Sequence, residues 1–389
     1  MASEKMKKAG LIICLLMVAE IVSAQTIFPF ASKSNRDSVT VKLKDQIHQT
    51  IKLPLNDSTS QKWMGAFWAM ELMLYKPAGY EEKISLQLSR LSQMGPGFQR
   101  AFFEMLYTLY PKEFDVEVHP IVKQLKSDKV KAMALEYLAL SGKSAFIDPS
   151  DKFLQSEYYL HYKYMRSKTQ QPLPSKKDFL DTSFLPNQTV LCSFQSTSRN
   201  IPGYLMIRLA DGTWMKNEKG EELKFPQLAR AISNLPFYLT NGNTPQGLYK
   251  ITGVDTSDNN WIGPTTNLQM VMPYENNSSE FFGTATAYEA HYNNLLGTHL
   301  QQFIGLKESY WAGKIGRTEI IAHGTTINPE YYKQQTYYPN TPSLGCLCSP
   351  ETWNEKGECT YSAQAQWMNY ILKPEQLPSY LIVAEVIDL

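Results

Sequence analysis

The sequence predicts an α+β protein with more than one domain, in which an N-terminal all-α helical domain precedes a β-rich domain with peripheral helices. The chain has 389 residues, whereas a single hydrophobic core stops growing at about 250–300 residues. Apolar residues recur at helical spacing up to about residue 180, and short runs of β-type residues separated by turns follow. The expected boundaries are 1–24 for a signal peptide, 25–170 for the helical domain, 171–184 for a linker and 185–389 for the β-rich domain.

The first 24 residues have the layout of a cleavable secretory signal peptide. Lysines at positions 5, 7 and 8 precede the apolar run Leu11–Val18, and the small residues Val22–Ala24 follow it, so cleavage is expected after Ala24. An uncleaved anchor is the alternative, although the run is short for a span of about 20 residues. Lipidation at Cys14 is disfavoured because small residues do not precede it. The protein is therefore predicted to be exported to the periplasm or cell envelope, with no stable membrane span after cleavage.

The helical domain is predicted from apolar stripes between about residues 57 and 170. One stripe lies between Ser127 or Asp128, as N-cap, and Gly142, as C-terminal stop. A second follows the turn Gly95–Gly97, and Trp63–Tyr75 indicates a third helix that is apolar nearly all round. The residues of the two stripes are Val130, Met133, Ala134, Tyr137 and Leu138, and Phe98, Phe102, Met105, Leu106 and Leu109.

The β-rich domain is predicted from short apolar runs beyond the polar, proline-containing segment Gln171–Lys177. Asp211-Gly212 is a hairpin signal between two of these runs. One helix, about Ser362–Leu372, interrupts the pattern. The predicted strands are Val190–Phe194, Tyr204–Leu209, Thr213–Met215, Phe237–Leu239, Tyr249–Thr252, Leu268–Met272, Glu319–Ala322 and Tyr380–Val386.

The charge balance excludes a general polyanion binder. Lys and Arg number 38 against 37 Asp and Glu, and removal of residues 1–24 leaves 35 of each. The sequence contains no dense Lys/Arg cluster, so nucleic acid is not an expected partner. A hydrophobic content of 43% also excludes a disordered protein.

Two segments carry residues suited to nucleophilic catalysis. His323 ends an apolar strand, and Cys346 follows the small turn Ser343-Leu344-Gly345. An imidazole at a strand end can activate a thiol, and a glycine before the cysteine lets backbone N–H groups approach an oxyanion. The residues alone leave two alternatives open, namely structural disulfides among the cysteines, and zinc bound by His323, Cys346, Cys348 and Cys359.

Three motifs in order resemble the catalytic domain of YkuD-type L,D-transpeptidases. They are Thr244-Pro245-Gln246-Gly247 with Tyr249, then His323-Gly324-Thr325, then Ser343-Leu344-Gly345-Cys346. The resemblance covers residues 235–352 well, extends over 185–389, and implies a compact β-sandwich with no metal or organic cofactor. It implies Cys346 as nucleophile and His323 as base, with the amides of Gly345 and Cys346 at the oxyanion. Gly324, Thr325 and Ser343 would shape the site, and Tyr249, Tyr274 and Tyr338 would contact substrate.

The resemblance also implies the reaction. Family members attack a peptidoglycan tetrapeptide stem at the carbonyl after the L-centre of its third residue and release the terminal D-Ala. A neighbouring stem amine then takes the acyl group from the cysteine thioester, which gives a 3→3 cross-link. Hydrolysis of the thioester, as in an L,D-carboxypeptidase, is the first alternative. A degenerate, non-catalytic wall-binding protein is the second.

Departures from the family pattern put substrate recognition in doubt. Leu344 stands where the family usually has His, and Cys348 where it usually has Arg. The spacing of the motifs indicates an insertion around Phe281–Gly316. Cys348 is expected to pair with Cys359 or with Cys192. The loop tyrosines 331, 332, 337 and 338 either form a lid over substrate or pin a long loop to the domain.

Overall fold

The computed structural model of the chain describes residues 27–276, 278–284, 288–373 and 377–389. The predicted signal peptide lies outside these residues. Over the described residues the protein is mixed α/β, with eleven α-helices and an eight-stranded mixed sheet. None of the helices in this part of the chain is both long and apolar enough to cross a bilayer.

Every regular element from Pro29 to Gln170 is helical, and a short 3-10 helix, Lys176–Leu180, lies in the predicted linker. The three expected helices are present. Helix α4 begins at Pro96, and proline is favoured in the first turn of a helix because its missing N–H would have no partner within the helix. Helix α1 was not predicted from the sequence, because it is polar and buries only Leu43, Ile47 and Thr50. The bounds are α1 Lys33–Thr50, α2 Ser60–Leu72, α3 Glu81–Arg90, α4 Pro96–Leu109, α5 Asp115–Val118, α6 Asp128–Ala139 and α7 Glu157–Ser167.

The second half contains the large sheet, in the order β3-β2-β1-β10-β4-β5-β6-β7, and a separate ribbon of β8 and β9. Pairs β1–β10 and β6–β7 are parallel and the others are antiparallel. The strands are β1 Val190–Gln195, β2 Gly203–Arg208, β3 Phe225–Gln227, β4 Gly247–Asp255, β5 Asn267–Val271, β6 Ala322–His323, β7 Leu347–Cys348, β8 Glu351–Trp353, β9 Cys359–Ser362 and β10 Tyr380–Glu385. The helices of this half are α8 Ser278–Phe282, α9 Glu289–Leu300, α10 Glu308–Lys314 and α11 Ala363–Ile371.

The sheet nearly closes on itself. Residues that directly follow the first strand of the order, β3, bond to the free edge of the last strand, β7. Leu228 and Cys348 exchange two backbone hydrogen bonds of 2.8 and 2.9 Å, and Ile232 donates to the carbonyl of Ser343 at 2.8 Å. This closure holds the turn before β7, which contains Cys346, against a second segment of backbone.

Three strand predictions are wrong or too long. The predicted strand Phe237–Leu239 is a turn and belongs to no strand of the sheet. The carbonyl of Phe237 accepts a hydrogen bond from the side chain of Arg317 instead of from a neighbouring strand. Thr213–Met215 contributes only an isolated bridge between Trp214 and Arg208. Of the predicted strand Glu319–Ala322, only the last residue belongs to β6.

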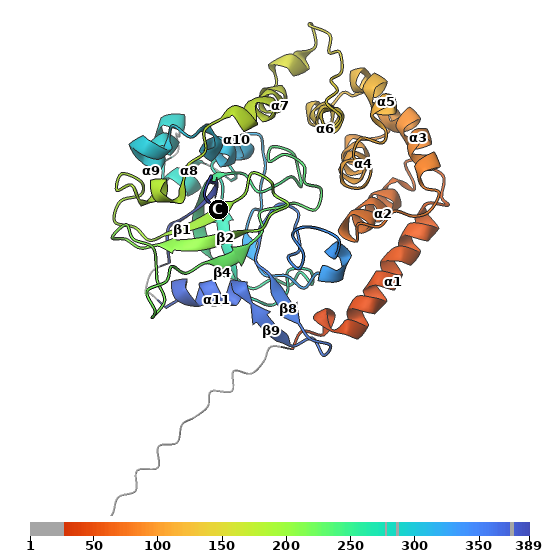
Figure 1. Cartoon of the computed structure of the whole chain (residues 1–389). Helices are drawn as coiled ribbons and strands as arrows, with labels where there is room; N and C mark the ends of the chain where they lie inside the picture. The colour runs from red at the N-terminus through yellow and green to blue at the C-terminus, as the bar shows by residue number, and fades with distance from the viewer. Residues whose placement is uncertain (1–26, 277, 285–287, 374–376) are drawn as a thin grey trace, which may run out of the picture.

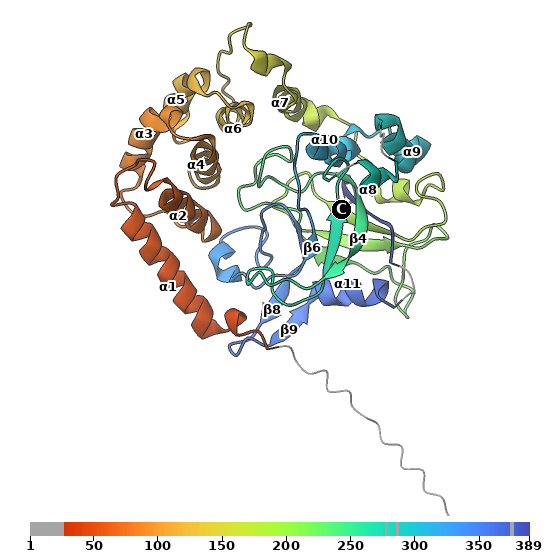
Figure 2. The same ribbon diagram turned by 180° about the vertical axis from the view of Figure 1, so that it is seen from behind.

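The helices before β1 form an arc around one side of the β-rich half (Figures 1 and 2). The arc starts at the β8–β9 turn, where Phe28 N donates to the Gly357 carbonyl at 2.7 Å. Residues of α2, α4 and α6 belong to the same hydrophobic core as one face of the sheet. The two halves therefore share a core, and the domain boundaries at 170 and 185 stay predictions.

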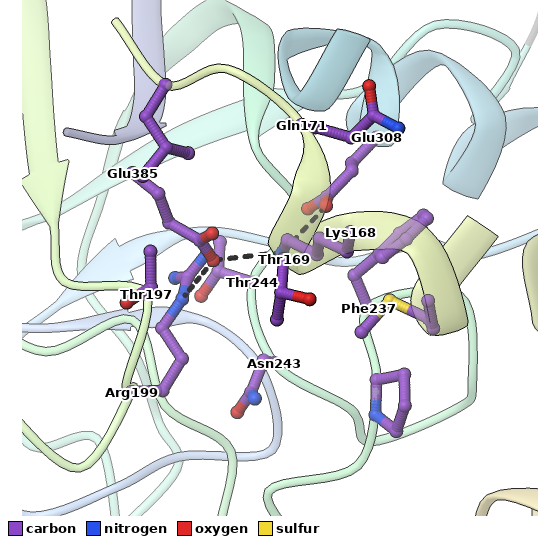
Figure 3. Close-up of a pocket in the computed structure, with 13 residues that line it drawn as sticks. Lys168, Thr169, Gln171, Thr197, Arg199, Phe237, Asn243, Thr244, Glu308 and Glu385 are labelled. Carbon is purple, nitrogen blue, oxygen red and sulfur yellow. Dashed lines mark hydrogen bonds and ion pairs between the residues drawn. The ribbon is translucent and has the colours of Figure 1, made fainter. Parts of the chain in front are cut away.

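A buried ionic network joins the end of the arc to the sheet (Figure 3). Lys168, just after α7, lies 2.9 Å from Glu308 on α10 and 3.0 Å from Glu385 on β10. Arg199 reaches the same Glu385 oxygen at 3.0 Å. Because both carboxylates are almost fully buried, removal of either cation would leave an uncompensated charge in the interior.

Candidate active site

His323 and Cys346 line the same cavity, which has a volume of about 720 Å³. Small-molecule sites are commonly about 300–1,000 Å³. The walls come from both halves of the chain, because Trp68 and Leu72 belong to α2. The other lining residues are Ile232, Thr252, Asn259, Trp261, Ile262, Gln269, Met270, Val271, Glu275, Asn276, Glu280, Glu319, Ile321, Ile327, Ser343 and Leu344.

His323 is positioned as a base. It ends β6, its side chain is buried, and its Nδ1 donates a hydrogen bond to the carbonyl of Gly324. A carbonyl oxygen can only accept, so the proton of the neutral ring is on Nδ1 and the lone pair is on Nε2. Nε2 has no hydrogen-bond partner among the described residues. It is therefore available to a group in the cavity.

The parallel pairing of β6 and β7 brings Cys346 to the same cavity. Ala322 pairs with Leu347, and both are fully buried. Successive side chains of a strand point to opposite faces, so His323 and Cys346, each one residue from this pair, lie on the other face. The partly exposed thiol of Cys346 donates to the carbonyl of Glu319 at 3.4 Å.

Ser343 fixes the turn before Cys346. Its Oγ accepts a hydrogen bond from Gly345 N at 3.0 Å and donates one to the carbonyl of Cys346 at 2.8 Å. The N–H of Gly345, expected at an oxyanion, is therefore already bonded within the turn, and its role with substrate stays a prediction. The N–H groups of Leu344 and Cys346 have no partner among the described residues, and that of Cys346 is the one beside the thiol.

The first motif bonds directly to this turn. Thr244 Oγ1 donates to the carbonyl of Gly345 at 2.8 Å. Arg317 lies behind the same turn, and its guanidinium donates to the carbonyls of Phe237, Gly242 and Asn243. Sequence reasoning missed Arg317, since no motif contains it. Its charge acts on the nucleophile by lowering the pKa of Cys346, against the larger effect of burial.

Glu351, on β8, holds the His-Gly-Thr segment and was also missed. Its carboxylate accepts hydrogen bonds from Thr325 N at 2.9 Å and from Ser362 Oγ at 2.6 Å. A Cβ at Gly324 would lie 2.3–2.5 Å from that carboxylate group, so any other residue there would displace the Glu351 side chain. Gly324 and Thr325 thus shape the site from behind, and neither lines the cavity.

Burial favours the neutral forms of the His323 imidazole and the Cys346 thiol. It lowers the pKa of His323, although the hydrogen bond to Gly324 has the opposite effect. Burial raises the pKa of the Cys346 thiol to about 11, and the carboxylates of Glu319 and Glu275 add to the rise. A thiolate at Cys346 would therefore require a base in the cavity, and His323 is the candidate.

The three tyrosines expected to contact substrate do not line the cavity. Tyr249 is fully buried in the core, where its hydroxyl donates to the carbonyl of Pro245. The hydroxyl of Tyr274 lies 3.0 Å from that of Tyr310. Tyr338 donates to Glu330 on the loop surface. Aromatic character in a motif did not reveal side-chain direction.

The tyrosine-rich loop is pinned to the helical arc. The Tyr332 hydroxyl donates to the carbonyl of Leu72 at 2.8 Å, and that of Tyr331 lies 2.6 Å from Thr40 Oγ1. Tyr332 and Tyr337 are almost fully buried. The structure thus favours the pinning interpretation over a lid. The contact with Leu72 also holds α2 at the cavity wall.

Cys348 is a buried free thiol, so the structure contains neither of its expected disulfides, with Cys359 or with Cys192. It lies on β7, 3.8 Å from Thr341 Oγ1, whereas Cys192 lies on β1 at the other side of β10, β4, β5 and β6. Cys359 lies on the separate β8–β9 ribbon, and its thiol donates to Tyr361. Zinc also lacks its ligand set, since no three His, Cys, Asp or Glu side chains within the described ranges gather to hold a metal.

Comparison with known proteins identifies no relative of this chain. The sequence matches no family model, and searches of curated proteins and of solved structures find no similar chain. The function of this chain is therefore inferred from the residues that line the cavity.

We expect Cys346 to be the fastest-alkylated cysteine at neutral pH. Cys192 and Cys348 are buried, which raises the pKa of each to about 12. Cys359 is partly exposed but does not line the cavity that holds His323. Iodoacetamide labelling of the folded protein without residues 1–24, followed by peptide mapping, measures the rates of these four cysteines. Faster labelling of Cys359 would show that His323 does not assist Cys346.

Proposed function

We propose that this protein is an exported cysteine acyltransferase that cross-links peptidoglycan stem peptides in the manner of L,D-transpeptidases. The proposal includes the finer fold assignment, with an L,D-transpeptidase-like β-sandwich at 185–389 after a helical domain at 25–170. It also includes location in the periplasm or cell envelope.

One observation carries the proposal. The three motifs that are distant in sequence meet at one place, because Thr244 bonds to Gly345 while His323 and Cys346 line one cavity. A thiol, an imidazole with an unshared lone pair and a backbone N–H beside the thiol are the groups that acyl transfer requires.

The reaction follows from these groups. His323 Nε2 takes the proton of Cys346 Sγ as the sulfur attacks the carbonyl carbon of the stem, and the N–H of Cys346 stabilises the oxyanion. The C–N bond to the terminal D-Ala then breaks, His323 returns the proton to the departing amine, and a thioester remains. An acceptor amine attacks the thioester, gives its proton to His323 and restores the thiol, which leaves a new amide bond.

Exposure to a carbapenem tests the nucleophile, since its strained lactam acylates an activated thiol. We expect one covalent adduct by intact mass on the protein without residues 1–24, and none on Cys346→Ala. Cys359→Ala is the matched control, because it removes the other partly exposed thiol and should leave the adduct unchanged.

Incubation with purified muropeptides tests the reaction. Cross-linked dimers with released D-Ala are the expected products. Release of D-Ala without dimers would assign hydrolysis instead. An adduct that persists on Cys346→Ala, or retention on sacculi with no change in their composition, would contradict the enzyme assignment and favour a wall-binding protein.

A further inference from the structure

Acidic side chains line the cavity. They are Glu275, Glu280 and Glu319, and no lysine or arginine among the described residues lines it. The nearest arginine behind the turn is Arg317, whose guanidinium is bonded to backbone carbonyls on the far side of Gly345. A ligand that enters therefore meets acidic side chains, of which Glu319 and Glu275 are near enough to the Cys346 thiol to raise its pKa.

Glu319 and Glu275 lie close to Cys346, and the carboxylate of Glu275 is held rigidly. The backbone carbonyl of Glu319 accepts the hydrogen bond of the Cys346 thiol. Glu275 accepts from the N–H groups of Met272, at 2.9 Å, and Glu319, at 2.5 Å, which fixes this carboxylate at the wall. A fixed charge loses little conformational freedom when it binds a ligand, so it discriminates more strongly than a mobile one.

Two further features of the cavity point to a ligand. The rings of Trp68 and Trp261 both line it, with centroids 5.6 Å apart and planes at 72°. Indole faces attract cations, and they do so more strongly when water is excluded. His323 is only 5% exposed, and its Nε2 is without a partner among the described residues. Acidic wall, aromatic wall and base thus enclose one volume.

We propose, on the basis of the proposed function, that this cavity selects an acyl-donor peptide whose side chain next to the reacting carbonyl ends in an ammonium group and carries no free carboxylate. The ammonium group is attracted by Glu319, Glu275 and Glu280. A carboxylate on the same side chain would be desolvated beside like charges, and no cationic side chain among the described residues lines the cavity to pair with it. A carboxamide at that place is neutral and is tolerated.

The residue at position 348 also favours a donor side chain without a free carboxylate. It stands at the position where the resemblance leads one to expect an arginine that holds an acidic group of the stem. Cys348 is 1% exposed and lies against Thr341. A neutral thiol supplies no positive charge, and among the described residues no lysine or arginine lines the cavity.

Three synthetic tetrapeptide stems test this selection. They differ only at the end of the third side chain, which carries an ammonium alone, an ammonium with a carboxylate, or an ammonium with a carboxamide. Calorimetric titration into Cys346→Ala at low ionic strength measures binding without turnover. We expect the carboxylate stem to bind about tenfold more weakly than the other two, which corresponds to about 1.4 kcal/mol.

Glu319→Gln, in the Cys346→Ala background, is the diagnostic variant, because Glu319 is exposed at the cavity wall and its side chain is not part of the core. It should reduce the discrimination by about threefold or more, since one of the repelling charges is removed. Glu330→Gln is the matched control, with the same change of charge on an exposed side chain outside the cavity. It should leave the discrimination unchanged.

The outcomes separate the selection from the reaction. Equal binding of the three stems, tighter binding of the carboxylate stem, or an equal effect of the two Glu→Gln variants overturns the selection, even if the wild type turns stems over. The expected order of affinity with no release of D-Ala by the wild type supports the selection and contradicts the proposed transferase. Binding of none of the stems contradicts both.

Discussion

Substitution of His323 by Gln should slow acylation of Cys346 by about 10²–10⁴-fold, the usual contribution of a general base. Burial raises the pKa of the Cys346 thiol to about 11, so almost no thiolate exists at neutral pH without a base. Glutamine has similar size and keeps a donor for the Gly324 carbonyl, but it cannot take a proton. The rate of carbapenem adduct formation, followed by intact mass, measures the loss.

The pH profile distinguishes a lost base from a disturbed turn. In the wild type the lowered pKa of His323 keeps the imidazole neutral below its usual titration range, so acylation should persist into mildly acidic solution. In His323→Gln the rate should instead rise about tenfold per pH unit until the pH approaches the pKa of the thiol. His48→Gln is the control, since His48 is exposed on α1 and contacts Tyr75. A variant rate within threefold of the wild type across this range would exclude His323 as the base.

The parts of the site that sequence could predict are those with a local signature. A histidine at the end of an apolar run and a cysteine after Ser-Leu-Gly are recognisable because strand ends and glycine turns have characteristic sequences. The meeting of His323 and Cys346 in one cavity was inferred from the resemblance, and the parallel pairing of β6 and β7 produces it. The same logic located α2, α4, α6 and the strands β1, β2, β4, β5 and β10, but not β3, β7, β8 or β9.

The parts that sequence could not predict depend on contacts between distant segments. Trp68 lies on a helix that precedes Cys346 by most of the chain, and it reaches the cavity only because the helical arc returns to the β-rich half. Arg317 and Glu351 have no motif, since each supports the site through backbone groups of other segments. The hydrogen bond between the amide of Gly345 and the side chain of Ser343 could not be predicted either, because only the fold shows it.

The turn that presents the nucleophile depends on the absence of a side chain at position 345, and Gly345→Ala should lower the free energy of unfolding by about 2–5 kcal/mol. Gly345 has φ of +118°, which alanine adopts only with strain. Its Cβ would also lie 2.2 Å from Nη2 of Arg317 and 2.6 Å from the carbonyl of Gly242. Arg317 cannot retreat without giving up the backbone carbonyls that hold it. Urea unfolding measures the loss, and the rate of carbapenem acylation should fall with it because the Thr244 and Ser343 bonds to the turn are displaced.

Gly316→Ala separates the two causes of that loss. Gly316 also has positive φ, +83°, but a Cβ there has no heavy atom within 4 Å outside its chain neighbours. It should therefore cost only the conformational strain, about 1 kcal/mol, and leave acylation unchanged. An equal loss of stability in the two variants would mean that strain alone explains Gly345 and that Arg317 does not hold the turn. A larger loss in Gly345→Ala, accompanied by slower acylation, would show that the arginine behind the turn and the thiol in front of it are parts of one rigid structure.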